Sequence, residues 1–298
     1  MSDDLESLAQ RLQASPDYRV LRRLQQPPRY HADVAPEHMR RALLVDVETT
    51  GLSHTDDAII ELGVILFTYD KTTGTVCEML RAESWLQDPG RPIPEEITQL
   101  TGITDADVQG ERLDEQALHE MATGASLVIA HNAAFDRPFI DKRLPFLANV
   151  HWGCSLNDVP WKSRNRGSQK LDYLLYQHTS TFLDTHHRAL DDCRATLHVL
   201  ATPFADGRTP LKLLLESCRV PRVRVGAIGA SYEVKDVLRN RGYSWSGDGG
   251  KPAKTWCREL PADELDAEVA WLHQQVYANR SRSPLVEKVE LRRRYAAS

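Results

Sequence analysis

The 298-residue chain is predicted to adopt an α/β fold, a mixed sheet flanked by helices. Strand-like apolar segments are grouped near the start of the folded part, and later strands alternate with helices. A change in charge balance after residue 218 indicates a second, smaller domain. We therefore expect a main domain at residues 40–210, a small basic α/β module at 219–280 and a C-terminal tail at 281–298.

The first segment of the chain is predicted to be helical. Leucines recur with helical spacing from Leu5 to Leu24, and Gln26-Pro27-Pro28 should end the helix. Residues 1–39 are thus expected to form an N-terminal helical extension ahead of the main domain.

The main domain is predicted to begin with three strands. They lie at residues 42–47, 58–69 and 76–86, with turns at Gly51 and Gly74, and should form an antiparallel meander. Apolar periodicity and flanking breakers predict the remaining elements, which are helices at 94–100, 113–123, 135–144, 169–178 and 189–201, and strands at 127–130 and 152–156.

Basic residues are concentrated in the C-terminal part of the chain. Residues 1–218 contain 22 Lys and Arg against 32 Asp and Glu, whereas residues 219–298 contain 15 against 10. A basic surface suits phosphate contacts, and solvated Lys and Arg side chains without a partner are an equal alternative. The elements predicted here are a basic strand leading to residue 225, helices at 234–241 and 262–277, a turn at 247–250 and a strand at 254–257.

Two tryptophans of this module have two interpretations. The favoured interpretation is that Trp245 and Trp256 form the core of this small domain. The other is that they join basic residues in a surface that binds single-stranded nucleic acid. Both hold together if the surface is formed by the basic side chains of Arg239, Arg241, Lys251 and Lys254.

Composition argues against several classes of protein. No apolar run approaches the roughly eighteen residues of a membrane span, and Met1-Ser2-Asp3-Asp4 is acidic where a signal peptide is basic. We therefore expect a cytoplasmic protein without membrane contact. The five cysteines contain no CxxC pair, which argues against a zinc site and against a disulfide framework.

Asp46 and Glu48 are the first candidate pair of acids. They are two residues apart on an apolar strand, so both carboxylates should point to one face at its carboxyl end. Burying two unpaired acids is costly, and bound metal would offset that cost. Oxygen ligands without cysteine favour Mg²⁺ or Mn²⁺ over zinc. Exposed acids beside a turn are the alternative for this pair taken alone.

A second motif, His131-Asn132-Ala133-Ala134-Phe135-Asp136, follows a predicted strand and opens a helix. Asp136 is a candidate acid because ligands collect where the strands of α/β sheets end. An acid near a helix start is also typical of helix capping, and the two roles are compatible. Asn132 either orients a neighbouring group or serves the turn.

The third motif contains two histidines and two aspartates. His186 and Asp191 are five residues apart, and so are His187 and Asp192, so spacing alone does not choose between the pairs. Together the three motifs supply four carboxylates and one histidine, which is the set that two hard cations and one general base need to cleave a phosphodiester. They predict a nuclease.

The chain resembles the DEDDh (DnaQ-like) 3'-5' exonucleases, the family of the proofreading epsilon subunit of DNA polymerase III and of RNase T. The family pattern is Asp-x-Glu, a middle Asp and His-x-Ala-x-x-Asp, and only His187, with Ala189 two residues on, fits its last part. Two more elements match, Thr101-Gly102-Ile103-Thr104 and Lys170-Leu171-Asp172-Tyr173-Leu174. The resemblance covers about residues 40 to 203.

The resemblance implies a ribonuclease-H-like fold, a DEDDh exonuclease domain at residues 40–210 and a set of catalytic residues. Two divalent cations, Mg²⁺ or Mn²⁺, would be held by the acids, with His187 as the general base. Asp46 would contribute to both cation sites, and Asp136 would act mainly through ordered water. The implied reaction releases nucleoside 5'-monophosphates from DNA 3' ends. The implied catalytic set is Asp46, Glu48, Asp136, His187 and Asp192.

Six residues are candidates for binding the 3'-terminal nucleotide. The Thr50 backbone and hydroxyl would face sugar or phosphate, Ile103 would be an apolar wedge against the base, and Phe135 would stack on a base unless it is a core aromatic. Such contacts tolerate any base. The full set is Thr49, Thr50, Gly51, Ile103, Asn132 and Phe135.

The expected partner is nucleic acid, most of all single-stranded DNA or a frayed 3' end. An exoribonuclease acting on RNA ends is one alternative, because discrimination of the 2'-hydroxyl depends on the shape of the pocket. A non-catalytic scaffold that docks on a polymerase or repair protein is the other. The complete set of clustered acids argues against a scaffold, which has no physical reason to keep them.

Overall fold

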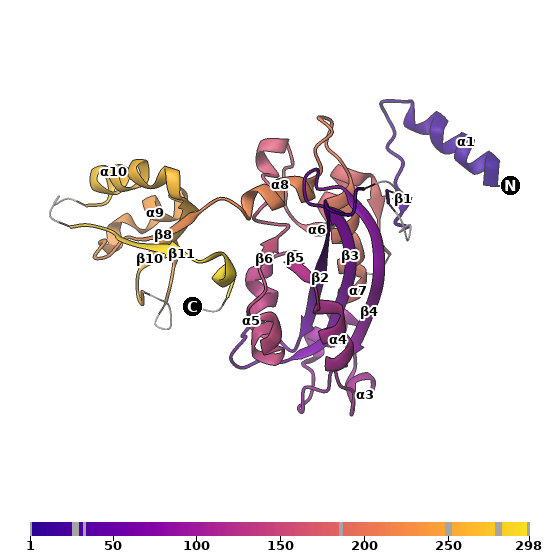
Figure 1. Ribbon diagram of the computed structural model, residues 1–298, viewed down its shortest axis with the longest axis horizontal. Helices are drawn as coiled ribbons and strands as arrows, with labels where there is room; N and C mark the ends of the chain where they lie inside the picture. Colours follow the sequence, from indigo (N-terminus) through magenta and orange to yellow (C-terminus); the bar gives the residue numbers. More distant parts are fainter. Residues whose placement is uncertain are drawn as a thin grey trace. The chain divides into compact units, whose positions relative to one another are not determined.

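The structure is a computed structural model that describes residues 2–25, 30–31, 34–184, 187–247, 252–277 and 282–296. The chain divides into two compact units, Met1–Leu215 and Glu216–Ser298, and each contains its own sheet (Figure 1). Several sequence predictions lie outside the described residues, namely those for Gln26-Pro27-Pro28, His186, residues 248–250 and Lys251.

The first unit is built on a five-stranded mixed sheet with the order β4-β3-β2-β5-β6. The first three strands run antiparallel as the predicted meander, and β5 and β6 run parallel to β2. In β3 every residue from Ile59 to Tyr69 is buried, which explains why this strand is nearly continuously apolar. The predicted α/β class is confirmed. The strands are β2 (Met39–Thr49), β3 (Ile59–Asp70), β4 (Val76–Leu86), β5 (Ala125–Ala130) and β6 (Trp152–Cys154).

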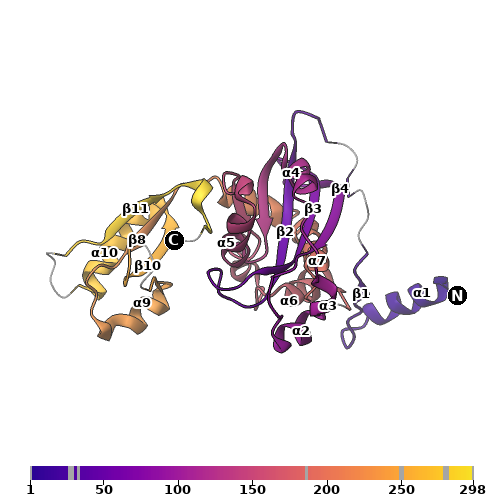
Figure 2. The ribbon, with the colours of Figure 1, turned by 90° about the horizontal axis from the view of Figure 1, so that it is seen from below.

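Helices flank this sheet (Figure 2). Helix α5 packs against β2, β5 and β6, and α7 packs against β2, β3 and β4. Gly63 of β3 allows the first turn of α7 to approach closely, because a Cβ atom there would lie 2.4 Å from the carbonyl carbon of Ala189. The helices are α2 (Glu95–Thr101), α3 (Asp105–Val108), α4 (Glu115–Ala122), α5 (Ala133–Arg143), α6 (Leu171–Leu174), α7 (Ala189–Ala201) and α8 (Pro210–Ser217).

The N-terminal segment differs from its prediction. Helix α1 spans Ser2–Gln13 and does not continue to Leu24, because Pro16 lacks the N–H that a helix interior requires. The following short strand β1 (Arg22–Arg23) pairs in parallel with β7 (Thr181–Phe182). A leucine period therefore predicted the beginning of the helix and missed its end.

The second unit has a four-stranded antiparallel sheet with the order β11-β8-β10-β9. Helices α9 (Lys235–Arg241) and α10 (Leu265–Gln275) contribute Leu238 and Leu272 to its buried core. Strand β11 falls in the stretch expected to be a tail, where alternating apolar residues pair with β8. The strands are β8 (Arg222–Gly226), β9 (Ser244–Trp245), β10 (Trp256–Pro261) and β11 (Leu285–Val289).

The favoured interpretation of the two tryptophans holds for only one of them. Trp256 is partly buried and packs against the core of the second unit. Trp245 is 52% exposed and is not among the residues that form or contact this core. Aliphatic residues with Tyr243 and Tyr277 provide the buried volume instead.

Within the described residues, no helix has the length and apolar character needed to cross a lipid bilayer.

Candidate active site

The three sequence motifs meet at one cavity of ≈ 370 Å³ in the first unit. Asp46 and Glu48 come from β2, Asp136 from the first turn of α5, and Asp192 from the first turn of α7, while His187 lies two residues before α7 begins. The cavity is lined by Asp46, Val47, Glu48, Thr49, Gly51, Leu52, Ile97, Leu100, Thr101, His131, Asn132, Phe135, Asp136, His187 and Asp192. All five residues of the implied catalytic set are therefore neighbours in space.

Asp136 connects α5 to the central strand. Its side chain is 2% exposed, and its Oδ1 accepts a hydrogen bond from the backbone N–H of Val47 at 3.2 Å. The residue at the N-cap of α5 is Asn132, in the left-handed conformation with φ 73°, and Asp136 lies four residues further into the helix. Helix capping thus does not explain the hydrogen bond between Asp136 and β2.

Burial and mutual repulsion raise the pKa values of the acids in the cavity. Burial, and then the charges of Asp136, Asp192 and Glu48, raise the pKa of Asp46 well above its ordinary range. Burial and the charge of Asp192 raise the pKa of Glu48 to about 8. Such a cluster favours any ligand that brings positive charge.

Three of these side chains form a compact group of possible metal ligands. One ligand atom each from Glu48, His187 and Asp192 lies within 4.8 Å of the others. His187 is exposed and has a positive φ of 63°, a conformation that is uncommon for a residue with a side chain. The adjacent Asp191 does not line the cavity, and its carboxylate forms an ion pair with Arg194 at 2.9 Å.

Glu61 of β3 is a functional neighbour that the sequence predictions missed. It lies opposite Glu48 in the sheet register, and its side chain is 1% exposed. Its carboxylate accepts hydrogen bonds from Arg188 Nη2 at 3.0 Å, from Arg188 Nε and the Ala189 backbone N–H at 3.1 Å, and from Ser84 Oγ at 2.7 Å. The sequence signal that could have identified Glu61 is its position as a charged residue within the apolar run 59–67.

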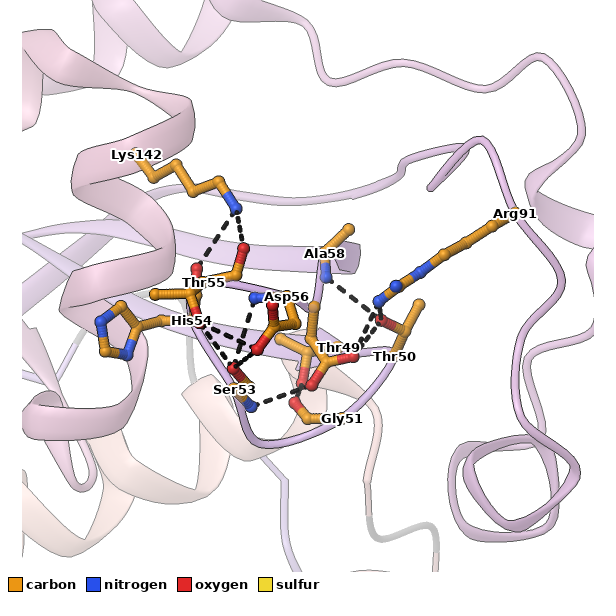
Figure 3. A network of polar contacts seen from close by, with 11 residues as sticks. Thr49, Thr50, Gly51, Ser53, His54, Thr55, Asp56, Ala58, Arg91 and Lys142 are labelled. Atoms are coloured by element: carbon orange, nitrogen blue, oxygen red, sulfur yellow. Dashed lines mark hydrogen bonds and ion pairs between the residues drawn. The ribbon is translucent and has the colours of Figure 1, made fainter.

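The loop at residues 50–58 forms one wall of the cavity and is held by a polar network (Figure 3). The Asp57 carboxylate accepts hydrogen bonds from Thr50 Oγ1 at 3.0 Å, the Ser53 backbone N–H at 2.9 Å and Arg91 Nη2 at 2.7 Å. The Ser53 bond is the leading cause that lowers the pKa of Asp57.

Two further contacts fix the same 50–58 loop. Lys142 Nζ of α5 donates to the carbonyl oxygens of His54 and Thr55 at 3.2 and 3.1 Å (Figure 3). Gly51 has no room for a side chain, because a Cβ atom there would lie 2.5 Å from the Asp57 carboxylate. The loop therefore presents Gly51 and Leu52 to the cavity in a defined position.

Two of the six predicted nucleotide-binding residues do not line the cavity. The Thr50 side chain is turned into the 50–58 loop, where its hydroxyl also accepts from Arg91 at 2.6 Å. Ile103 is 2% exposed and packs with Ile60, Ile93 and Val108. A spacing along the chain does not tell which side of a turn faces a cavity. Thr49, Gly51, Asn132 and Phe135 do line it.

Three apolar side chains that the sequence did not single out line the cavity, and Ile103 does not. Leu52 is 85% exposed and Leu100 is 50% exposed, and both line the cavity with Ile97. Exposed leucines beside a cavity are suited to contact a flat apolar ligand such as a base. Phe135 also lines the cavity, while its ring lies 5.2 Å from that of Phe139.

His131 lines the cavity as a neutral structural group. Its Nε2 donates to the carbonyl oxygen of Gln169 at 2.9 Å, so its Nδ1 accepts from Ser155 Oγ at 2.7 Å. Burial lowers the pKa of His131 to about 4. It is thus occupied in holding the chain around the cavity.

Comparison with known proteins assigns this chain to a family of exonucleases. Residues 43–200 match the RNase T family, which is described as exonuclease. The matched segment is more than half of the chain, and the chain belongs to this exonuclease family.

The relatives found among curated proteins are much longer than this chain. DNA polymerase III PolC-type of Clostridium perfringens (strain 13 / Type A) is 34% identical over 167 residues, which are 54% of this chain and 11% of that protein. The PolC-type polymerase of Caldanaerobacter subterraneus subsp. tengcongensis is 34% identical over 163 residues, with shares of 53% and 11%. The chain thus spans about a tenth of the length of these relatives.

Solved exonuclease structures are also similar to this chain. Exonuclease X in complex with 5' overhanging duplex DNA has a TM-score of 0.40 and 24% identity, covering 57% of this chain and 99% of that chain. The zinc-bound form of the E. coli ExoI–ssDNA complex has a TM-score of 0.46 and 16% identity, covering 85% and 66%.

Proposed function

We propose that the protein is a metal-dependent 3'-5' exonuclease that releases nucleoside 5'-monophosphates from single-stranded or frayed DNA 3' ends. The observation that carries the proposal is the convergence on one cavity of four acids from β2, α5 and α7 and of His187 from the segment just before α7. Membership of the exonuclease family supports the reaction class. The PolC-type DNA polymerase relatives support DNA as the substrate and a polymerase as a partner.

The acids of the cavity fit divalent cations. Their carboxylates are hard oxygen donors, and the raised pKa values of Asp46 and Glu48 reflect burial first and repulsion from neighbouring acids second, two effects that a bound cation would offset. Asp46, Glu48 and Asp192 would hold one cation, Asp46 would also contact a second, and Asp136 would act there through water. Mg²⁺ or Mn²⁺ would supply charge neutralisation of the phosphodiester and acidification of the attacking water.

The side chains around this centre have separate tasks. His187, exposed at the cavity, takes a proton from the attacking water, a role suited to an imidazole because its ordinary pKa is close to neutral. Leu52 and Leu100 contact the terminal base, and Phe135 stacks against the same nucleotide. None of these contacts reads base identity, as trimming or proofreading of any sequence requires.

End-labelled oligonucleotides test the proposal. Single-stranded DNA, mismatched duplex DNA and RNA are incubated with Mg²⁺, Mn²⁺ or chelator; shortening is followed from a 5' label, and the released nucleotides are identified by chromatography. We expect shortening from the 3' end, release of 5'-mononucleotides and no reaction with chelator. Asp192→Asn and His187→Ala should each lower the rate by about a hundredfold or more.

Asp191→Asn is the matched control for Asp192→Asn. Asp191 is adjacent in sequence but pairs with Arg194 outside the cavity, so its variant should retain nearly full activity. Equal rates for Asp192→Asn and wild type, or shortening from the 5' end, would show that the proposal is wrong. Faster degradation of RNA than of DNA would replace the proposed substrate and keep the site.

A further inference from the structure

The second unit exposes two large aromatic side chains that its core does not use. Tyr232 is 78% exposed and Trp245 is 52% exposed, and neither is one of the buried residues that form the core of this unit. Trp245 lies directly opposite Trp256 in the β9–β10 pair, and the two rings meet edge to face with centroids 5.6 Å apart. The rings are therefore available to a flat ligand from solvent.

Cationic side chains lie against these rings. Lys235 Nζ is 4.0 Å from the centroid of the Tyr232 ring, and Arg239 Cζ is 5.8 Å from that of Trp256. Lys235 and Arg239 are four residues apart on α9, so they share one face of the helix. We call these five residues the aromatic–basic stripe: Tyr232, Lys235, Arg239, Trp256 and Trp245.

The charges of the stripe differ from those that hold the second unit together. Arg241 and Arg258 donate to the carboxylate of Glu268, which is 2% exposed, so both are committed to a buried pair. The ion pair between Arg239 and Asp236 is exposed at both ends, 64% and 65%. An exposed pair contributes little, so a phosphate can replace the Asp236 carboxylate at low cost.

We propose that the aromatic–basic stripe binds single-stranded nucleic acid, as a second binding site beyond the active-site cavity. Stacking of unpaired bases on Tyr232 and Trp245 and phosphate contacts from Lys235 and Arg239 form the interaction. The excess of 15 Lys and Arg over 10 Asp and Glu in residues 219–298 supplies the charge complementarity. A duplex hides its base faces, so the stripe prefers a single strand.

Binding of a fluorescein-labelled oligothymidylate to the full chain, measured by anisotropy with chelator present, tests the proposal. The chelator stops hydrolysis, so the result does not depend on the proposed exonuclease activity. Trp245→Ala and Tyr232→Ala should each weaken binding by about tenfold, since stacking accounts for much of the affinity. Trp245→Phe keeps an aromatic face and should bind nearly as well as wild type.

Salt dependence tests the cationic part of the stripe. The double variant Lys235→Ala with Arg239→Gln should bind more weakly than wild type at low salt and show a shallower loss of affinity as salt rises. Lys288→Ala is the matched control, because Lys288 is exposed on β11 of the same unit and outside the stripe.

Three results would overturn the proposal. They are an unchanged affinity of Trp245→Ala for the oligonucleotide, a loss of affinity in Lys288→Ala equal to that of the double variant, and a preference for duplex over a single strand of the same length.

Hydrolysis of a small substrate such as the p-nitrophenyl ester of thymidine 5'-monophosphate reports on the catalytic unit alone. Its rate should be the same in all stripe variants.

Discussion

Glu61 is the residue on which the position of the His187 segment depends. The buried carboxylate binds Arg188 through two nitrogens and the Ala189 backbone N–H, directly after His187. The positive φ of His187 is an uncommon conformation, and it persists where surrounding contacts determine it. The pKa of Glu48 is raised overall, by burial first and by neighbouring acids second, and the positive charge of Arg188 opposes part of this rise.

Arg188→Ala is therefore expected to affect both stability and rate. The Arg188 side chain is 46% exposed, so its loss should lower the free energy of unfolding by only about 1–3 kcal/mol, as expected for a buried acceptor that loses a partner. Hydrolysis of single-stranded DNA should slow by about tenfold or more, because His187 loses its anchor. Urea unfolding and initial rates measure the two effects.

The control for this prediction is Arg194→Ala, in the helix α7 that begins directly after Arg188. Its partner Asp191 is partly exposed and outside the cavity, so the change should cost less than about 1 kcal/mol and leave the rate nearly unchanged. Arg188→Lys keeps the charge but loses the bidentate geometry, and should fall between wild type and Arg188→Ala. Indistinguishable behaviour of the Arg188 and Arg194 variants would contradict the role assigned to Glu61.

At the residue scale, motifs predicted which side chains lie together in space. Asp46, Glu48 and Asp136 were named from their places at strand ends and helix starts, and all line the cavity. Glu61 was missed because its partner Arg188 is 127 residues away, and no spacing rule connects them. Ile103 was misplaced because a motif fixes the backbone turn and leaves the direction of the side chain open.

At the scale of the element, the 50–58 loop determines the shape of the cavity wall. It has only one short turn of its own, and its position comes from Asp57, Arg91 and Lys142. Arg91 joins it from 34 residues away and Lys142 from 87. A loop fixed by such contacts holds Leu52 in place without a helix or strand.

Asp57→Ala should loosen this loop. The variant removes an acceptor shared by Thr50, Ser53 and Arg91, so Leu52 no longer has a fixed position. We expect KM for single-stranded DNA to rise by about tenfold with a smaller change in kcat. Steady-state kinetics measure this.

Asp56→Ala is the matched control for the loop. Asp56 is the exposed neighbour of Asp57, and its carboxylate accepts hydrogen bonds from Ser53 Oγ and Thr55 Oγ1 at the tip of the loop. Its variant should keep the KM of wild type. A rise of KM in both variants would mean that the loop responds to any loss of charge, and not to the loss of the Asp57 network.

Elements were predictable from the sequence to the extent that their signals are local. The meander β2–β4, the parallel strand β5 and helix α7 all lie where apolar periodicity places them. The end of α1 was not predicted, because a proline overrides the leucine period. The pairing of β11 with β8 was not predicted either, because a short strand is stable only when paired and the sequence does not show which strand is its partner.

At the scale of the whole molecule, the pKa of a buried glutamate is shifted in opposite directions in the two units. In the first unit, burial and neighbouring acids raise the pKa of Glu48 to about 8. In the second, burial tends to raise the pKa of Glu268, but the bond from Arg241 and the charge of Arg258 outweigh it and lower the pKa. The second unit thus supplies arginines that offset the charge of its buried acid, whereas in the first unit burial and repulsion between neighbouring acids outweigh the charge of Arg188 on Glu48.

The two units should consequently respond to pH in opposite directions. The pKa of Glu48 is raised from its ordinary value of 4.5 to about 8 in the folded, metal-free first unit. Between these two pH values the folded unit therefore binds more protons than the unfolded chain. The free energy of unfolding of this unit falls as pH rises through that window. The second unit is stabilised by ionised Glu268 and loses that contribution as pH falls below 4.5 and through the lowered pKa.

Hydrogen exchange followed by mass spectrometry resolves the units and measures this difference. With chelator, backbone protection of β2 and β3 should decrease from about pH 6 to about pH 8, after correction for the intrinsic exchange rate, while that of β10 and α10 stays constant. Adding Mg²⁺ near pH 8 should restore protection in the first unit only, because a cation that binds the folded acids stabilises that unit. Glu48→Gln removes one titrating acid and should flatten the pH dependence. Equal loss of protection in both units, or no effect of Mg²⁺ on the first, would show that the acid cluster does not govern its stability.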